Sequence, residues 1–218
     1  MEDILDWIKT LIDYDHVTYV KGDLAGVCLY RLSQGSQAWY VKIKDQDLEE
    51  ELRSEVEIYH YLRGRVVVPE TKFFTHFGSY SVHCFTDLNG QDKDHLIDQM
   101  DPDAYVKLYG QALRQLHDLD GVDCPISRMP SDSVEGYKFK PDQAVMIHGN
   151  FSLDNLIKIK DQVAYMHMGL GGRGDRYKDL AMAVDQVKEH FGQDYLDKFF
   201  QSYGLYPIEY DKIKYYLC

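Results

Sequence analysis

The sequence predicts an α+β protein built from two lobes, a small strand-rich lobe followed by a helical one. Its first part carries short runs of β-branched and aromatic residues separated by turn signals, whereas its later part carries apolar residues at helical spacing. Between the two parts, Asn89 and Gly90 break the pattern. We therefore expect an N-terminal lobe over residues 1–88 and a C-terminal lobe over residues 89–218, each large enough to bury apolar side chains.

The N-terminal lobe is expected to contain two helices and five strands. Ile4, Ile8 and Leu11 recur at helical spacing, which predicts an amphipathic helix over residues 3–14. Residues 45–63 repeat this spacing and end at Gly64, a residue typical of a helix C-terminus. The predicted strands cover residues 17–20, 27–32, 38–43, 72–77 and 80–86, with turns at Gly35-Ser36 and Gly78-Ser79.

The C-terminal lobe is expected to be mainly helical. Pro102 stands in the first turn of a helix that runs to Leu116. A loop rich in Pro, Ser and Gly follows over residues 125–143, and a hairpin is expected around Asp161-Gln162. The hairpin strands are predicted at residues 156–160 and 163–166, and three final helices at residues 177–191, 194–203 and 208–217.

Composition narrows the class of protein. With 24 basic and 36 acidic residues the formal charge is −12, which disfavours nucleic acid as a partner because its phosphates would be repelled. An acidic surface suits a cationic substrate, although it also simply keeps a protein soluble. No apolar run approaches the length of a membrane span, and the acidic N-terminus does not resemble a signal peptide. Four cysteines without CxxC spacing favour free thiols in a cytoplasmic protein.

The most informative segment runs from Ile147 to Asn155 and is followed, twelve residues after Asn155, by His167-Met168-Gly169. Phosphotransferases with the kinase fold carry His-x-Asp-x-x-x-x-Asn in the catalytic loop and Asp-x-Gly in the metal loop. The frame and the spacing are both present here. However, Asn150 stands where the catalytic base is expected, and His167 stands where the metal-binding carboxylate is expected.

Together with its flanking segments, this block resembles the aminoglycoside phosphotransferase family nearly from end to end. The resemblance implies a bilobal protein-kinase-like fold with ATP as the phosphoryl donor. The segments that carry it are His148–Asn155, Gly169 and Gly172, Asp175–Ala181, Leu116-His117, Cys124-Pro125, Gly204 and Ile213–Tyr216.

In the N-terminal lobe the resemblance assigns the nucleotide site. Lys42 corresponds to the strand lysine that neutralises the α- and β-phosphates, and Glu55 to its ion-pair partner, with Glu57 as an alternative on another face of the helix. Each residue also has an ordinary structural interpretation, such as a solvated strand edge for Lys42. The nucleotide loop is expected between Gly22 and Gly26, and the hinge that offers backbone groups to adenine at Thr86-Asp87-Leu88.

The two replaced positions change the expected chemistry. An asparagine at position 150 keeps a hydrogen-bonding oxygen but has negligible basicity, and loss of a general base typically costs roughly 10²–10⁴ in rate. Magnesium prefers hard anionic oxygen ligands, whereas imidazole suits zinc or copper, so His167 is a poor magnesium ligand. Asn155 remains as a neutral metal ligand, and Asp154 is the nearby carboxylate that would partly compensate.

Substrate recognition is also expected to differ from that of the relatives. Leu170 stands where they often carry an arginine, the stretch from Pro125 to His148 is shorter than their helical insert, and the chain ends soon after Tyr215-Tyr216. Asp175 and Asp179 are interpreted as structural braces. A transition-metal site made of His83, His148 and His167 is disfavoured, since lone histidines are far more often structural.

The sequence therefore favours an aminoglycoside-phosphotransferase-like protein that has lost its catalytic groups, a pseudo-phosphotransferase with a regulatory or scaffolding role. ATP binding is expected to be weak and Mg²⁺ binding doubtful, and the expected partners are a nucleotide or small molecule, or another protein. Two alternatives stay open: an active ATP-dependent small-molecule phosphotransferase that uses a rearranged site, and an engineered inactive variant.

Overall fold

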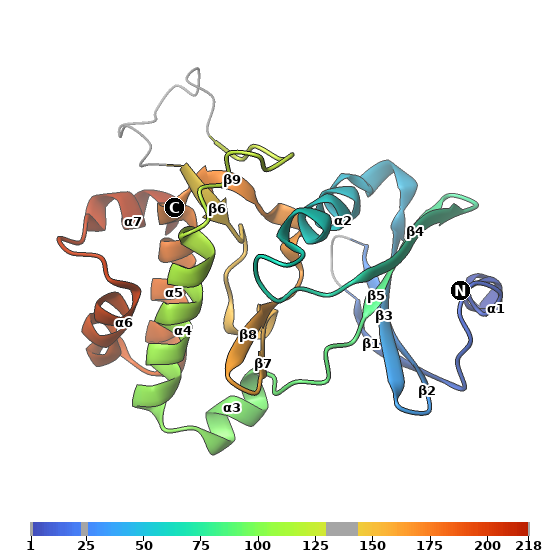
Figure 1. Cartoon of the computed structure of the whole chain (residues 1–218), viewed down its shortest axis with the longest axis horizontal. Coiled ribbons are helices and arrows are strands. Elements are labelled where there is room, and N and C mark those ends of the chain that lie inside the picture. The colour runs from blue at the N-terminus through green and yellow to red at the C-terminus, as the bar shows by residue number, and fades with distance from the viewer. Residues whose placement is uncertain (1, 23–25, 130–143, 218) are drawn as a thin grey trace.

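The computed structural model describes residues 2–22, 26–129 and 144–217. A strand-rich N-terminal part and a helical C-terminal part lie side by side, so the predicted α+β class is confirmed (Figure 1). The division at residues 88 and 89 remains a prediction. At this point β5 (Tyr80–Thr86) ends and Asn89 adopts a left-handed conformation with φ 49°.

The N-terminal part is a five-stranded antiparallel sheet in the order β1-β2-β3-β5-β4. One face of the sheet packs against α1, where Val41, Ile43 and Cys84 are buried together with Ile4 and Ile8. The opposite face turns toward α2 and the C-terminal part (Figure 1). The strands are β1 (His16–Gly22), β2 (Cys28–Gln34), β3 (Gln37–Asp45), β4 (Thr71–Phe77) and β5.

The first helix is shorter than predicted. α1 spans Glu2–Ile8, although apolar residues continue at helical spacing as far as position 12. After Ile8 the backbone makes a tighter turn, with the Leu11 amide donating to the Ile8 carbonyl. The Tyr14 hydroxyl then donates back to the Leu5 carbonyl at 2.9 Å. The prediction of a helix over residues 3–14 was wrong at its C-terminal end because the chain folds back here to pack Tyr14 on the sheet.

The second helix begins later than predicted. α2 covers Glu50–Leu62, whereas residues 45–63 were expected. Asp45 belongs to β3, where it pairs with Tyr80, and a single 3₁₀ turn over Gln46–Leu48 separates the strand from the helix. The predicted end is confirmed: Arg63 caps α2, and Gly64 follows with φ 78°.

The C-terminal part contains one helix and two strands that the sequence did not predict. α3 (Lys93–Gln99) is capped by the Asp92 side chain, which accepts a hydrogen bond from the His95 amide. β6 (Ala144–Ile147) pairs with β9 (Gly172–Asp175) and so joins the segment before His148 to the segment after Gly171. The predicted elements are found as α4 (Pro102–His117), β7 (Leu156–Ile159), β8 (Gln162–Tyr165), α5 (Arg176–His190), α6 (Leu196–Tyr203) and α7 (Tyr210–Leu217).

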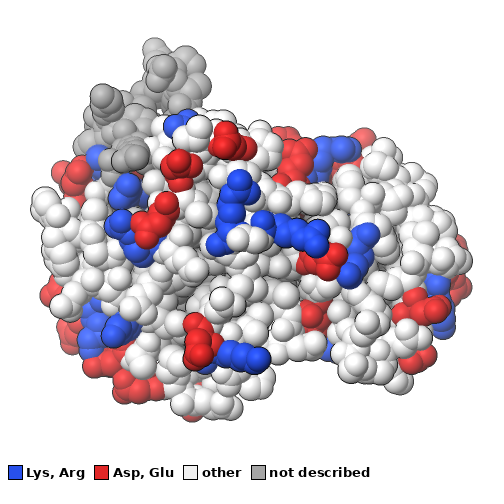
Figure 2. Space-filling model, in the orientation of Figure 1, with Lys and Arg blue, Asp and Glu red and all other residues white. Residues whose placement is uncertain are grey.

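The larger hydrophobic core joins the two parts. Ile58, Tyr59 and Leu62 of α2 and Phe85 of β5 are buried in the same cluster as the side chains of α4, α5 and α6. α2 therefore positions the sheet relative to the loops after β6 and β8. On the face shown in Figure 2, acidic and basic side chains are interspersed over both parts. Among the described residues, no helix combines the length and apolarity that crossing a membrane requires.

Candidate nucleotide and phosphoryl-transfer site

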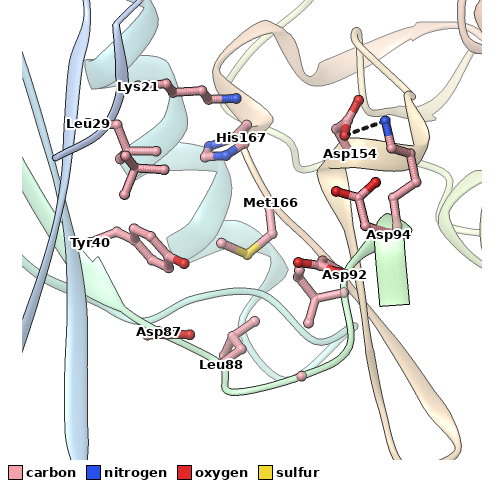
Figure 3. A pocket seen from close by; sticks show the side chains of 14 residues that line it. Lys21, Leu29, Tyr40, Asp87, Leu88, Asp92, Asp94, Asp154, Met166 and His167 are labelled. Atoms are coloured by element: carbon pink, nitrogen blue, oxygen red, sulfur yellow. Dashed lines mark ion pairs between the residues drawn. The ribbon is translucent and has the colours of Figure 1, made fainter. Parts of the chain in front are cut away.

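Two adjoining pockets lie between the sheet and the loops of the C-terminal part. The outer pocket has a volume of about 300 Å³ and reaches from β1 and β2 to the segment after β5 (Figure 3). The inner pocket, of about 140 Å³, continues toward α2 and brings Lys42, Asn150, Asn155 and His167 together. Lys21, Leu29 and His167 line both pockets, so one cleft brings Lys42 and Leu88 of the N-terminal part together with Asn150, Asn155 and His167.

Lys42 projects from the middle of β3 and forms a buried ion pair with Glu55 on α2. Its Nζ lies 2.7 Å and 2.9 Å from the two carboxylate oxygens of Glu55. His83 on β5 adds a contact from Nδ1 to Glu55 Oε2 at 3.1 Å. Burial raises the pKa of the Glu55 carboxyl, but Lys42 and the hydrogen bond from His83 outweigh that effect and hold it well below its usual value. The alternative, Glu57, is exposed to solvent.

The segment that resembles a catalytic loop is held by Asp179 of α5. This carboxylate accepts hydrogen bonds from the amides of His148 and Gly149, at 2.6 Å and 2.8 Å. Gly149 has φ 80°, and a Cβ there would lie 1.9 Å from the Leu170 carbonyl oxygen, so the position requires glycine. The Asn155 side-chain amide donates to the Asn150 carbonyl at 2.8 Å and closes the loop.

A buried histidine completes this brace. His117 Nε2 lies 3.2 Å from Asp179 Oδ2, and its Nδ1 lies 2.8 Å from the Tyr203 hydroxyl. Burial lowers the pKa of His117, although the hydrogen bond to Asp179 opposes that shift. A neutral ring that donates from Nε2 and accepts at Nδ1 satisfies both partners. The interpretation of Asp179 as a structural brace is confirmed, and Asp175 likewise caps α5 by accepting from the Tyr177 amide.

His167 occupies the position that resembles the metal-binding carboxylate. Its backbone is left-handed, with φ 58° and ψ 47°, a conformation in which Asn, Asp and His are enriched among non-glycine residues. Its amide donates to the Tyr59 hydroxyl at 2.9 Å, which fixes the loop on α2. Burial, followed by the nearby Lys42 ammonium, lowers the pKa of His167 to about 3, so the ring is neutral. Its Nδ1 is buried without a hydrogen-bond partner among the described residues.

Two further contacts seat this loop against α2. A Cβ on Gly169 would lie 2.5 Å from Glu51 Cγ and 2.8 Å from the Glu51 carbonyl oxygen, so only glycine permits this packing. The Arg128 guanidinium donates to the Gly169 carbonyl at 3.1 Å and to Ser54 Oγ at 3.1 Å. The sequence did not predict this role for Arg128, because the residue lies within the predicted loop over residues 125–143 and matches no motif.

The segment after β5 lines the outer pocket with backbone and apolar groups. The Asp87 amide donates to the Ala38 carbonyl of β3 at 2.9 Å, whereas the Leu88 amide has no hydrogen-bond partner among the described residues. Leu88 and Met166 lie across the pocket from Leu29 (Figure 3), and Ile157 also lines it. Thr86 does not line the pocket; its hydroxyl accepts from the Glu70 amide at 2.9 Å. The Thr86 amide donates to the Glu70 carbonyl at 3.0 Å, and the role of Thr86 in the hinge stays a prediction.

The glycine loop can be placed only in part. Gly22 ends β1, and Gly26 has φ 78° with open space around it. Residues 23–25 lie outside the described residues, as do residues 130–143 of the predicted loop before β6. Neither glycine lines the pockets.

Several acidic residues in the outer pocket were not expected from the sequence. Asp87, Asp92 and Asp94 line it together with Asp154, the carboxylate that was considered as a compensating ligand (Figure 3). Asp154 forms an ion pair with Lys93 at 2.9 Å and remains 58% exposed. Asp92 is the N-cap of α3, and an aspartate is a common residue at that position. No helix was predicted here, so the sequence did not indicate that these aspartates would lie in the pocket.

The donor set does not suit Mg²⁺. The side chains at the metal position are a neutral imidazole and the Asn155 amide, and the amide nitrogen already donates to Asn150. Mg²⁺ prefers carboxylate and water oxygens in an octahedral shell. Within the described ranges, no three His, Cys, Asp or Glu side chains gather in a metal-binding cluster, so His83, His148 and His167 do not form one.

The profile of the phosphotransferase enzyme family matches residues 28–164, and the chain belongs to this family. It is similar to the aminoglycoside 3'-phosphotransferase of Niallia circulans, at 28% identity over 237 residues that cover 93% of this chain and 86% of that protein. The corresponding protein of Enterococcus faecalis is 24% identical over 229 residues, covering 87% and 86%.

Solved structures of aminoglycoside phosphotransferases have the same fold. The type VIII aminoglycoside-3'-phosphotransferase superimposes with a TM-score of 0.79 at 20% identity, covering 99% of this chain and 96% of that one. Aminoglycoside phosphotransferase APH(3'')-Id from Streptomyces rimosus, in complex with ADP and streptomycin, gives 0.77 at 20% identity, covering 99% and 96%. The predicted kinase-like fold is therefore confirmed.

Proposed function

We propose that this chain is an aminoglycoside-phosphotransferase-like pseudoenzyme that binds a nucleotide weakly and does not transfer its phosphoryl group. The observation that carries the proposal is His167: a neutral imidazole occupies the left-handed position of the metal loop, within the electrostatic influence of Lys42. A group of this kind supplies neither the charge nor the hard oxygen that a phosphate-bridging metal ion requires. The doubtful Mg²⁺ site of the sequence prediction is thus part of the proposal.

Support for nucleotide binding comes from the outer pocket. Leu29 on one side and Ile157 and Met166 on the other form apolar walls suited to a flat base. The Leu88 amide is available to donate a hydrogen bond at the edge of such a base. The Lys42 ammonium, held by Glu55, lies deeper in the cleft, where the phosphates of a nucleotide bound in this way would lie. The N-terminal lobe, residues 1–88, would then supply most of the nucleotide contacts.

The proposed inactivity has a second cause at Asn150. An amide cannot accept a proton from an acceptor hydroxyl at neutral pH, whereas a carboxylate at this position can. The loop that carries Asn150 is nevertheless held firmly by Asp179 and by the Asn155 amide. The fold therefore positions a side chain that lacks the required chemistry. Such a protein would act by binding, in a regulatory or scaffolding role in the cytoplasm, where ATP is available.

An active phosphotransferase with a rearranged site is the second candidate. The observation that favours it is Asp154, a carboxylate that lines the outer pocket next to Asn155 in the chain. The names of the relatives from Niallia circulans and Enterococcus faecalis, both aminoglycoside 3'-phosphotransferases, fit this candidate equally well. Its weakness is that Asp154 is engaged by Lys93 and lies on the exposed side of the cleft.

The deciding experiment is an ATP-dependent phosphorylation assay of the purified protein with kanamycin, using the Niallia circulans relative as a positive control. We expect no product above background from the unmodified chain, and none from Asn150→Asp. The double variant Asn150→Asp/His167→Asp should gain slow ATP hydrolysis in the presence of Mg²⁺, because a base and a carboxylate ligand are restored together. Robust turnover by the unmodified chain would instead establish the second candidate.

A further inference from the structure

A row of four side chains crosses the cleft-facing side of the sheet. In the strand register Lys21 of β1 pairs with Leu29 of β2, Leu29 pairs with Lys42 of β3, and Lys42 pairs with His83 of β5. Directly opposed residues of neighbouring strands project from the same face of a sheet. Lys21 therefore faces the same cleft as Lys42, two strands away.

The position of Lys21 depends on an irregularity in β1. The register runs from Tyr19 opposite Tyr30 directly to Lys21 opposite Leu29, which leaves Val20 as an extra residue. In a regular ladder Val20 would oppose Leu29, and Lys21 would oppose Cys28 and project from the other face. The bulge thus turns Lys21 into the cleft, as bulges beside binding sites often do for one side chain.

Lys21 also differs from the other lysines around the cleft in having no acidic partner. Lys42 is paired with Glu55, Lys44 with Glu51, and Lys93 with Asp154. Within residues 2–22, 26–129 and 144–217, Lys21 forms no ion pair, yet it lines both pockets. Its side chain extends above the His167 ring in Figure 3. An unpaired ammonium directed into a cleft leaves positive charge that is not neutralised by the protein.

The acidic residues near Lys21 divide between the two pockets. Asp87, Asp92, Asp94 and Asp154 line the outer pocket, whereas Lys21 and Lys42 share the inner pocket with one carboxylate, Glu51, which is paired with Lys44. Both Lys42 and Lys21 contribute to lowering the pKa of His167, so the two ammonium groups act on the same point in the cleft. A divalent cation would be repelled there by two positive charges and attracted by no carboxylate at position 167. A polyanion would be attracted for the same reasons.

We propose that Lys21 is a phosphate-binding residue that, together with Lys42, holds the polyphosphate of a nucleoside di- or triphosphate without a divalent metal ion. The inference rests on the proposed function, since it assumes that a nucleotide occupies the cleft. It goes further in naming the ligand form: the metal-free polyphosphate, with Lys21 supplying positive charge where a metal ion would otherwise supply it. The bulge at Val20 is the structural feature that makes this possible.

The test is titration calorimetry of the full chain with ATP, ADP, adenosine and inorganic tripolyphosphate, each in EDTA and in Mg²⁺. The variants are Lys21→Gln, Lys21→Arg and the matched control Lys72→Gln, which removes the same charge from an exposed site on β4 outside both pockets. Because Lys21 is exposed on an edge strand, Lys21→Gln should retain the melting temperature of the unmodified chain.

We expect ATP to bind at least as tightly in EDTA as in Mg²⁺. Lys21→Gln should weaken ATP and tripolyphosphate binding by about tenfold, while adenosine binding, Lys21→Arg and Lys72→Gln stay within about twofold of the unmodified chain. Equal losses in Lys21→Gln and Lys72→Gln, or ATP binding that is more than about tenfold tighter with Mg²⁺, would overturn the role of Lys21 and leave nucleotide binding intact. Absence of both ATP and adenosine binding would overturn the proposed function as well.

Discussion

Two side chains in the C-terminal part, the buried Asp179 and the half-buried His167, differ in their hydrogen bonds. Asp179 receives hydrogen bonds from two backbone amides and from His117. His167 is fixed through its backbone by Tyr59, but its ring nitrogen Nδ1 is buried with no partner among the described residues. The Asp179 carboxylate therefore stabilises the fold through both of its oxygens. His167 contributes its backbone amide to the fold, while its ring forms no hydrogen bond through Nδ1 within the described residues.

The same contrast separates the paired charges around the cleft from the uncharged side chains at its centre. The ion pair of Lys42 and Glu55 and the brace at Asp179 would be costly to break, because each leaves buried charge or backbone unpaired. Asn150 and His167 lie between them and carry no charge. The loops that carry Asn150 and His167 are therefore held by Asp179 and Tyr59, not by charge at these two side chains.

The largest expected effect follows from Asp179. Replacing Asp179 with Asn removes the charge that two amides and His117 share, and leaves at least one buried donor unmatched. We expect the free energy of unfolding to fall by about 3–5 kcal/mol, measured by urea denaturation. Asp161→Asn, the same change at the exposed tip of the β7–β8 hairpin, should cost less than about 0.5 kcal/mol. Equal losses at the two positions would contradict the brace.

A dependence of stability on pH should come next in size. Burial lowers the pKa values of His117, His148 and His167, the last to about 3, relative to 6.5 for an unperturbed histidine. Below pH 6.5 the unfolded chain therefore binds protons that the folded chain does not, so stability is complete above that pH and is lost as the pH falls. Between pH 7.5 and 5.5 we expect a loss of about 2–4 kcal/mol in the free energy of unfolding.

The control for this pH effect is a comparison of two histidine variants. His117→Gln keeps a neutral donor and acceptor, so its stability should fall less steeply between pH 7.5 and 5.5 than that of the unmodified chain. The same change at His60, which is exposed on α2, should leave the slope unaltered. A slope that is independent of His117 would contradict a lowered pKa, because it would mean that this ring binds protons equally in the folded and unfolded chain.

Much of the frame could be predicted from the sequence because its determinants are local. Lys42 follows a run of strand-forming residues and Glu55 lies on a helix with clear periodicity, so their ion pair could be expected from the order of elements. The turn glycines Gly35 and Gly78 and the end of α2 at Gly64 were also predicted, since left-handed turns favour glycine.

The features that were missed depend on partners distant in the sequence. β9 reads Gly172-Arg173-Gly174-Asp175, which has no strand propensity and forms because β6 pairs with it at close approach. The bulge that directs Lys21 into the cleft is a property of two paired strands, so no pattern in β1 alone could reveal it. Arg128 bridges Ser54 of α2 and the Gly169 carbonyl through contacts that only the tertiary structure brings together.

A double-mutant cycle would measure the interaction energy between Lys42 and Glu55, on the other side of the cleft from Asp179. Glu55→Gln leaves Lys42 and His83 without their buried anion, and should lower the free energy of unfolding by about 2–3 kcal/mol in a urea titration. Lys42→Met combined with Glu55→Gln should cost less than the sum of the two single changes, by about 1–2 kcal/mol. Additive losses would mean that the ion pair contributes little and that the frame is held by hydrophobic packing alone.

The smallest expected effect concerns Lys93 and Asp154, the ion pair on the exposed side of the outer pocket. Lys93→Gln should change the free energy of unfolding by less than about 1 kcal/mol, because surface ion pairs contribute little. The variant nevertheless frees the one carboxylate that lies beside Asn155 and lines the pocket. If Asp154 served as a metal ligand in an active enzyme, Lys93→Gln would tighten Mg²⁺-dependent ATP binding in a calorimetric titration. We expect no such gain, because Asp154 opens toward solvent and the position nearest Lys42 remains the neutral His167.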